Sequence, residues 1–145
     1  MVEQVSVFLE NKPGHLAQLA RTLASASINM RALMVADTED FGVVRVICDR
    51  PRAARSALES AGFGVSITQV VAVEMPDRPG ALADVLETLG GEGINVEYAY
   101  AFVEPGLDAA VDVFKVDDDR AGSVLAQAGL TVLGPEKLYE LDSTP

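Results

Sequence analysis

The sequence predicts an α+β fold made of two tandem copies of one small unit. When the chain is shifted by 66 residues, positions 5–29 align with positions 71–95, and ten of these 25 positions are identical. Unrelated segments of this length would share about one or two residues. In both copies, alternating apolar and polar residues indicate strands, and apolar residues spaced by three and four positions indicate helices.

The first half of each copy is predicted to be a strand followed by a helix. The strand positions recur at every second residue and the helix positions at i, i+3, i+4 and i+7, which places each apolar set on one face. These positions are Val5, Val7 and Leu9, then Leu16, Leu19, Ala20 and Leu23, and in the second copy Val71, Val73 and Met75, then Leu82, Val85, Leu86 and Leu89.

The second half of each copy is predicted to add a strand hairpin, a helix and a last strand. Polar turns, "DTEDFG" and "VEPGLD", suit the hairpins, and Gly62 and Gly129 stand where the second helices should end. The predicted ranges for strand, strand, helix and strand are 28–37, 42–48, 51–61 and 64–69 in the first copy, and 94–103, 109–116, 119–128 and 131–135 in the second.

The resulting order is βαββαβ twice, the ferredoxin-like arrangement with helices on one face of an antiparallel sheet. A unit of about 65–70 residues is close to the lower size limit for a stable core of its own. We therefore expect two domains, 1–69 and 70–145, packed side by side. The tail 136–141 aligns with 69–74 and is expected to form an extra strand that covers a sheet edge.

Composition and charge exclude several classes of function. The net charge of −11 opposes binding to nucleic acid, and all of this imbalance lies in residues 71–145. No apolar run approaches the ~20 residues that span a bilayer, and the N-terminus lacks the features of a signal peptide. Cys48 is the single cysteine, which excludes an internal disulfide and a cysteine-based metal cluster. These features predict a soluble cytoplasmic protein that binds neither nucleic acid nor membranes.

Each copy carries a Pro-Gly loop between its first strand and first helix. The loops are Asn11-Lys12-Pro13-Gly14 and Asp77-Arg78-Pro79-Gly80. Asn and Asp are favoured helix N-caps, and the free N–H groups of a helix start attract a carboxylate. The Asn11 amide or the Asp77 carboxylate could accept hydrogen bonds from an ammonium group, so the loop has the chemistry of a receptor for a free amino acid. The same residues could also be a purely structural cap.

The duplication favours the binding interpretation over the structural one. An Asn follows each loop residue after eighteen positions, as Asn29 and Asn95, and each is preceded by Ile. Strand, "N-x-P-G-x-L", helix and "I-N" within βαββαβ resemble the ACT domain, a small regulatory module of amino-acid metabolism. The resemblance covers the whole chain as two tandem copies.

The resemblance implies that the ACT units pair side by side and bind amino acids at the interface. Asn11 would then act with Asn95, and Asp77 with Asn29, giving two sites in one polypeptide. A ligand-binding His found in some members two residues before the loop Asn is replaced here by Leu9 and Met75. Asp77 stands where Asn is more usual, so the two sites are expected to differ in affinity.

The predicted ligand-binding residues are the two loops, the first helical residues and the segments around the two strand Asn residues. They are Asn11, Lys12, Pro13, Gly14, His15, Leu16, Ile28, Asn29, Met30, Asp77, Arg78, Pro79, Gly80, Ala81, Leu82, Ile94, Asn95 and Val96. We expect no cofactor, metal or catalytic residue, since no nucleophile–base set, glycine-rich phosphate loop or pair of His ligands is present.

Other residues admit two interpretations each. His15 is either an exposed helix-start residue or a ligand contact, and Cys48 is expected in the core. Tyr98 and Tyr100 could line a pocket, but core packing is favoured. A basic cluster, Arg50, Arg52 and Arg55, and an acidic cluster, Asp117, Asp118 and Asp119, are expected to be solvated; pairing between them is the alternative.

These observations predict a non-catalytic amino-acid sensor that acts as a homodimer and regulates a metabolic enzyme or another regulator. The alternative is a constitutive interaction subunit whose loops are purely structural and which has no small-molecule ligand.

Overall fold

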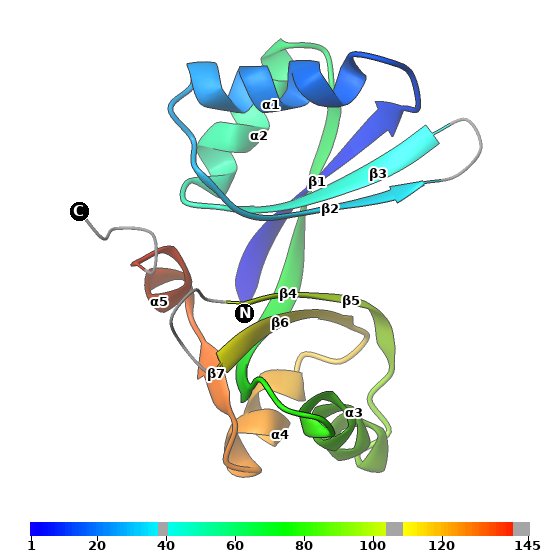
Figure 1. Cartoon of the computed structure of the whole chain (residues 1–145), viewed down its shortest axis with the longest axis vertical. Coiled ribbons are helices and arrows are strands. Elements are labelled where there is room, and N and C mark those ends of the chain that lie inside the picture. The colour runs from blue at the N-terminus through cyan, green and yellow to red at the C-terminus, as the bar shows by residue number, and fades with distance from the viewer. Residues whose placement is uncertain (38–40, 104–108, 141–145) are drawn as a thin grey trace. The chain divides into compact units, whose positions relative to one another are not determined.

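The sequence repeat corresponds to two units in the computed structural model (Figure 1). The structure describes residues 1–37, 41–103 and 109–140. The N-terminal unit comprises Glu3–Thr68, and the C-terminal unit comprises residues 69–140 together with Met1–Val2. Both have the predicted βαββαβ order, which confirms the ferredoxin-like α+β class.

The N-terminal unit contains four strands and two helices. Its elements are β1 (Val2–Glu10), α1 (His15–Ser25), β2 (Met30–Asp37), β3 (Phe41–Cys48), α2 (Pro51–Ser60) and the first part of β4 (Gly64–Pro76). The strand order is β2-β3-β1-β4, with β3 antiparallel to both β1 and β2. Strand β2 is therefore an edge of this unit's sheet, on the side away from β4.

The C-terminal unit repeats this arrangement. It uses the second part of β4, followed by α3 (Ala81–Gly91), β5 (Val96–Val103), β6 (Ala109–Val116), α4 (Ala121–Gln127) and β7 (Thr131–Leu133). Strand β4 pairs antiparallel with β6 and β7, and β6 pairs with β5, so the order is β7-β4-β6-β5. Strand β5 corresponds to β2 and is likewise an edge.

Each unit has its own core between sheet and helices, built from the predicted apolar faces. The first core includes Val5, Val7, Leu19, Leu23, Val44, Val46 and Leu58, and the second includes Val71, Val73, Val85, Leu89, Phe114, Val116 and Leu125. Each fully buried Val, Leu or Phe contributes about 1.5–3 kcal/mol relative to an exposed one. The strand and helix periods in the sequence identified much of both cores, but Leu16, Leu82 and Leu86 of the predicted helix faces are exposed.

The C-terminal tail differs from its prediction. Where an extra strand was expected at 136–141, the structure has helix α5 (Pro135–Glu140), with Leu138 fully buried. Pro is well tolerated in a first helical turn, and Glu136 there interacts favourably with the helix dipole. The alignment with 69–74 was misleading because it carried the apolar spacing but not these start signals.

Strand β4 runs without interruption through Gln69 and serves as the last strand of one unit and the first of the other. The tips of the two predicted hairpins, at 38–40 and 104–108, lie outside the described residues. Among the residues that the structure describes, no helix is long and apolar enough to cross a membrane.

Candidate functional site

The two Pro-Gly loops have the same backbone conformation. Gly14 and Gly80 have φ values of 87° and 90°, in the left-handed region, directly before the first residues of α1 and α3. The His15 N–H donates to the Lys12 carbonyl and the Ala81 N–H to the Arg78 carbonyl, both at 3.3 Å. Glycine is needed here because other L-residues adopt this φ only with strain.

The predicted N-caps are wrong. The cap positions belong to Gly14 and Gly80, and no side chain caps either helix. The left-handed glycine turns the chain after the loop, so α1 and α3 begin four residues beyond Asn11 and Asp77. Both of these side chains lie at exposed positions ahead of the helices. The helix starts therefore keep their N–H groups free of side-chain caps.

The two strand Asn residues are held by carboxylates that the sequence interpretation missed. The Asn29 N–H donates to Asp49 Oδ1 at 3.2 Å, and the Asn95 N–H donates to Asp117 Oδ1 at 3.0 Å. In return, the Asp49 N–H donates to the Asn29 carbonyl at 3.2 Å, and the Asp117 N–H to the Asn95 carbonyl at 3.3 Å. Asp49 and Asp117 thus fix the backbone of Asn29 and Asn95 where β2 and β5 begin.

The equivalence of Asp49 and Asp117 can be recognised in the sequence once the correct offset is used. The strand registers of the two units match at an offset of 68 in this region, since Val5 pairs with Val46 and Val71 with Phe114. At that offset Asp49 aligns with Asp117, whereas the sequence interpretation had placed Asp117 in an acidic cluster.

A small pocket lies beside the loop of the N-terminal unit. Its volume is about 90 Å³, and it is lined by Leu9, Glu10, Asn11, Lys12, Leu16, Val35 and Gly42. Three of the predicted residues, Asn11, Lys12 and Leu16, meet there. Lys12 forms an ion pair with Glu10 at 2.7 Å, and the hydrogen bond and charge of Lys12 lower the pKa of Glu10. Because ligand pockets usually measure about 300–1,000 Å³, this pocket can supply only one wall of a site.

The register identifies the corresponding residues of the C-terminal unit. Val35 pairs with Val44 across β2 and β3, and Ala101 pairs with Asp112 across β5 and β6. Asp112 is 3% exposed, and its Oδ2 atom has no hydrogen-bond partner among the described residues. Burial raises the pKa of this carboxyl to about 6. Sequence reasoning did not single out Asp112, although it interrupts the apolar run of β6.

Several predicted residues lie apart from this pocket. Ile28, Ile94 and Ala81 are buried, so their side chains belong to the unit interiors. His15 lines a separate pocket of about 190 Å³ beside Gln18 and Phe63. The exposed predicted residues are Pro13, Gly14, Asn29, Met30, Asp77, Arg78, Pro79, Gly80, Leu82 and Asn95, and Val96 is half-buried against the second core.

One residue from each charged cluster, Arg50 and Asp118, has its partners within its own unit. Arg50 Nη2 donates to the carbonyls of Ala26 at 3.0 Å and Ser27 at 2.5 Å, beyond the end of α1. The aligned residue Asp118 instead holds Arg120, with 2.7 Å between Oδ2 and Nη2.

Cys48 is buried, as predicted, and burial raises its pKa to about 11. Tyr98 and Tyr100 are half-buried and lie outside the second core, because a bulge before Tyr98 pairs it with Lys115.

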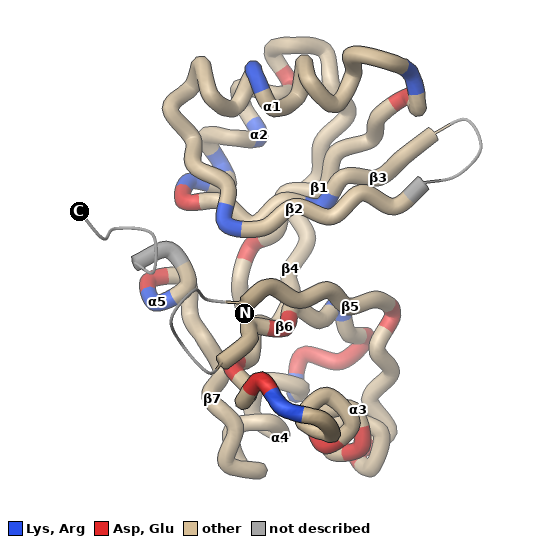
Figure 2. The backbone as a smooth tube through the Cα atoms, viewed as in Figure 1, with Lys and Arg blue, Asp and Glu red and all other residues tan. Residues whose placement is uncertain are grey.

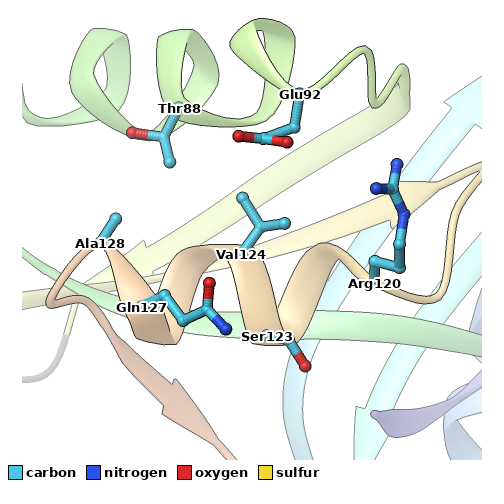
Figure 3. Close-up of a pocket in the computed structure, with 7 residues that line it drawn as sticks. All are labelled: Thr88, Glu92, Arg120, Ser123, Val124, Gln127 and Ala128. Carbon is cyan, nitrogen blue, oxygen red and sulfur yellow. The ribbon is translucent and has the colours of Figure 1, made fainter.

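A larger groove lies between α3 and α4. Figure 3 shows Thr88 and Glu92 projecting from α3 toward α4, and Val124 projecting back. The groove has a volume of about 460 Å³ and is also lined by Arg120, Ser123, Gln127 and Ala128. Two of its polar groups have local partners: Thr88 donates to the Asp84 carbonyl at 2.8 Å, and Arg120 forms an ion pair with Asp118. None of the predicted site residues lines this groove.

The charge asymmetry follows the two units. Figure 2 shows most of the basic residues in the N-terminal unit and mainly acidic residues in the C-terminal unit. The loop of the C-terminal unit therefore lies in more negative surroundings than the loop of the N-terminal unit, and Asp77 and Asp112 add to this negative charge.

The chain is similar to known proteins over nearly its whole length. The family model of the ACT domain pair matches residues 1–141. A protein from Bacteroides thetaiotaomicron is 38% identical, with 96% of each chain covered and a TM-score of 0.90. The ligand-free regulatory subunit of aspartate kinase from Thermus thermophilus is 16% identical, with 88% of this chain and 90% of that chain covered and a TM-score of 0.68.

The corresponding aspartate kinase subunit from Thermus flavus is 15% identical over the same shares of the two chains, with a TM-score of 0.65. At these identities the kinase subunits share the fold of this chain. No curated protein sequence matches.

Proposed function

Because this chain belongs to the ACT domain pair family, we propose that it is a non-catalytic regulatory protein that binds a free amino acid at interfaces between its ACT units. The observation that carries the proposal is the duplicated arrangement of a left-handed Gly, an uncapped helix start and a strand Asn locked by an Asp. Two domains, 1–69 and 70–145, would each supply one such half-site.

The half-site has complementary groups for both ends of an amino acid. The free N–H groups at the start of an eleven-residue helix, α1 or α3, favour the α-carboxylate. The Asn11 amide oxygen or the Asp77 carboxylate would accept hydrogen bonds from the α-ammonium. Asn95 and Asn29, from the paired unit, would complete the two sites.

Exposed apolar side chains beside each half-site support an interface there. Leu16, Met30, Leu33, Val35 and Phe41 are between 36% and 59% exposed in the N-terminal unit, and Leu82, Leu86 and Val103 are between 38% and 57% exposed in the C-terminal unit. They lie on or beside the edge strands β2 and β5 and on α1 and α3. An exposed apolar edge strand is a common place for a second unit to bind. A second unit bound there would supply the remaining walls of the binding site.

We propose a homodimer as the form that brings these edges together. Its ligand would regulate a metabolic enzyme or another regulator by favouring one of two arrangements, which requires different affinities for the two. Cytoplasmic location, with no role for nucleic acid or membrane, belongs to the same proposal. The same exposed edges also suit a constitutive interaction subunit without a ligand, which is the competing function.

A thermal-shift screen of the full chain against the twenty amino acids separates the two functions. A ligand at 100 times its dissociation constant stabilises the folded state by about 2.7 kcal/mol. For a chain of this size that corresponds to a rise in Tm of roughly 5–10 °C. If no amino acid raises Tm at millimolar concentration, the sensor proposal fails and the interaction subunit stands.

A further inference from the structure

Asp112 is a buried carboxylate in the C-terminal unit, and one of its two oxygens lacks a partner among the described residues. The residue is 3% exposed, and Oδ2 has no hydrogen-bond partner among the described residues. An unpaired buried carboxylate costs several kcal/mol, so most buried acids in proteins are paired. The N-terminal unit avoids this cost, since its equivalent residue is the fully buried Val44.

The strand register places Asp112 beside the C-terminal half-site. Asp112 pairs with Val73 on one side and with Ala101 on the other. Val73 belongs to the second core, so Asp112 faces the helix-covered side of the sheet. The Met75–Ala110 pair lies near the end of the sheet that carries the Pro-Gly loop. The Val73–Asp112 pair is two residues further from that end, or about 7 Å along the strand.

The residue that pairs with Asp112 on the edge strand also differs between the two units. Val35, which lines the N-terminal pocket, is replaced by Ala101, whose smaller side chain is exposed on the edge strand β5. The two units thus differ at both positions of this strand pair. Val35 and Val44 are apolar in the N-terminal unit, whereas the C-terminal unit has the smaller Ala101 and the acidic Asp112. The C-terminal unit therefore has a smaller side chain on β5 and a carboxylate on β6.

We propose that Asp112 determines the specificity of the C-terminal site, where its carboxylate receives the positively charged side chain of the bound amino acid. The inference rests on the proposed function, in which the α-amino and α-carboxylate groups bind at Asp77 and the start of α3. A cationic group at the end of a side chain of about 7 Å would then reach the row of Asp112. The ligand class of this site is an amino acid with a second amino group or a guanidinium group. The N-terminal site, with Val44, takes an uncharged side chain.

The raised pKa of Asp112, which is caused by burial, is consistent with this role, because an ammonium group would supply a counter-charge to the buried carboxylate. In a site shielded from water, a charge-assisted hydrogen bond of this kind is stronger than the neutral equivalent. A ligand without the cation would leave the carboxylate unpaired.

Isothermal titration calorimetry of the full chain tests the inference with L-lysine, L-ornithine and L-norleucine. Norleucine has the length of lysine without its terminal amino group. We expect one site per chain that binds lysine or ornithine at least tenfold more tightly than norleucine. In Asp112→Asn, the affinity for the cationic ligand should fall at least tenfold while that for norleucine is unchanged.

Two further variants control for folding and for location. Asp112→Val copies the N-terminal unit and should abolish the preference for the cation. Asp119→Asn removes an exposed carboxylate of the same unit, outside the proposed site, and should leave the preference intact. Equal affinities for lysine and norleucine, or equal losses of both in Asp112→Asn, would overturn the inference while leaving the amino-acid sensor in place. Failure of every amino acid in the thermal-shift screen would overturn both.

Discussion

The backbone N–H of Asn29 donates to Asp49 Oδ1 at 3.2 Å, and the Asp49 N–H donates back to the Asn29 carbonyl at 3.2 Å. The C-terminal unit repeats this reciprocal pair between Asn95 and Asp117. Each pair joins the start of one strand to the end of its neighbour, next to the exposed Asn of a proposed site. Its conservation between the two copies, which differ at most other positions, indicates that it orients the Asn.

Removing either carboxylate should weaken one site without unfolding the unit. Asp49→Ala and Asp117→Ala each lose one exposed hydrogen bond to the backbone, so we expect a loss of about 0.5–1.5 kcal/mol in the free energy of unfolding. Amino-acid affinity should fall several-fold, because the Asn is no longer held. Urea denaturation and calorimetry measure the two effects. Asp119→Ala, at an exposed position nearby, is the matched control; an equal loss of affinity there would contradict the assignment.

Replacing the loop glycines should destabilise both units. Gly14→Ala and Gly80→Ala put a Cβ at φ values of 87° and 90°, which costs about 1–2 kcal/mol. Gly90→Ala is the matched control, because Gly90 lies in helix α3 with open space around its Cβ position. There, Ala should stabilise the chain by roughly 0.5–1 kcal/mol. Thermal unfolding gives both signs, and a Gly14→Ala variant as stable as wild type would show that the loop can adopt another conformation.

Much of the fold could be predicted because it depends on the period of apolar residues. The alternation of Val5, Val7 and Leu9 and the helical spacing of Leu16, Leu19 and Leu23 locate the elements in both copies, and glycines mark several helix ends. The tail could not be placed in the same way, since its apolar spacing fits both a strand and a helix. Pro135 and Glu136 were the signals that decided it.

The candidate site was only partly predictable because its main features are not local in sequence. The loops and strand Asn residues were found through the repeat, but Asp49 and Asp117 act through pairing between strands. Asp112 becomes informative only when the register sets it beside Ala101 and shows that its equivalent in the other unit is Val44. The N-cap prediction failed because Gly14, in the left-handed conformation, occupies the cap position. The presence of Asn11, a favoured cap residue, three positions earlier gives no sign of this.

Arg50 is expected to stabilise the end of α1. Its guanidinium donates to the carbonyls of Ala26 and Ser27, which follow the last helical residue. Arg50→Ala leaves these carbonyls to water and removes a positive charge from a helix C-terminus, so we expect a loss of about 1 kcal/mol. Arg55→Ala is the control, because its exposed ion pair with Glu59 at i, i+4 is worth only about 0.3–0.5 kcal/mol. Equal losses in urea denaturation would contradict a capping role for Arg50.

Asp112 should make the stability of the chain fall as the pH rises. Burial raises the pKa of this carboxyl from 3.8 to about 6, so the folded state binds the proton more tightly than the unfolded state does. The contribution of Asp112 to the free energy of unfolding is therefore most favourable below pH 4. It decreases between pH 4 and pH 6 by an amount on the order of 2 to 3 kcal/mol. Asp112→Asn and Asp112→Val do not titrate, so both should gain stability relative to wild type over this range. Urea denaturation at pH 4, 5, 6 and 7 measures the difference; parallel profiles for wild type and Asp112→Asn would show that the carboxyl has a partner in the folded protein.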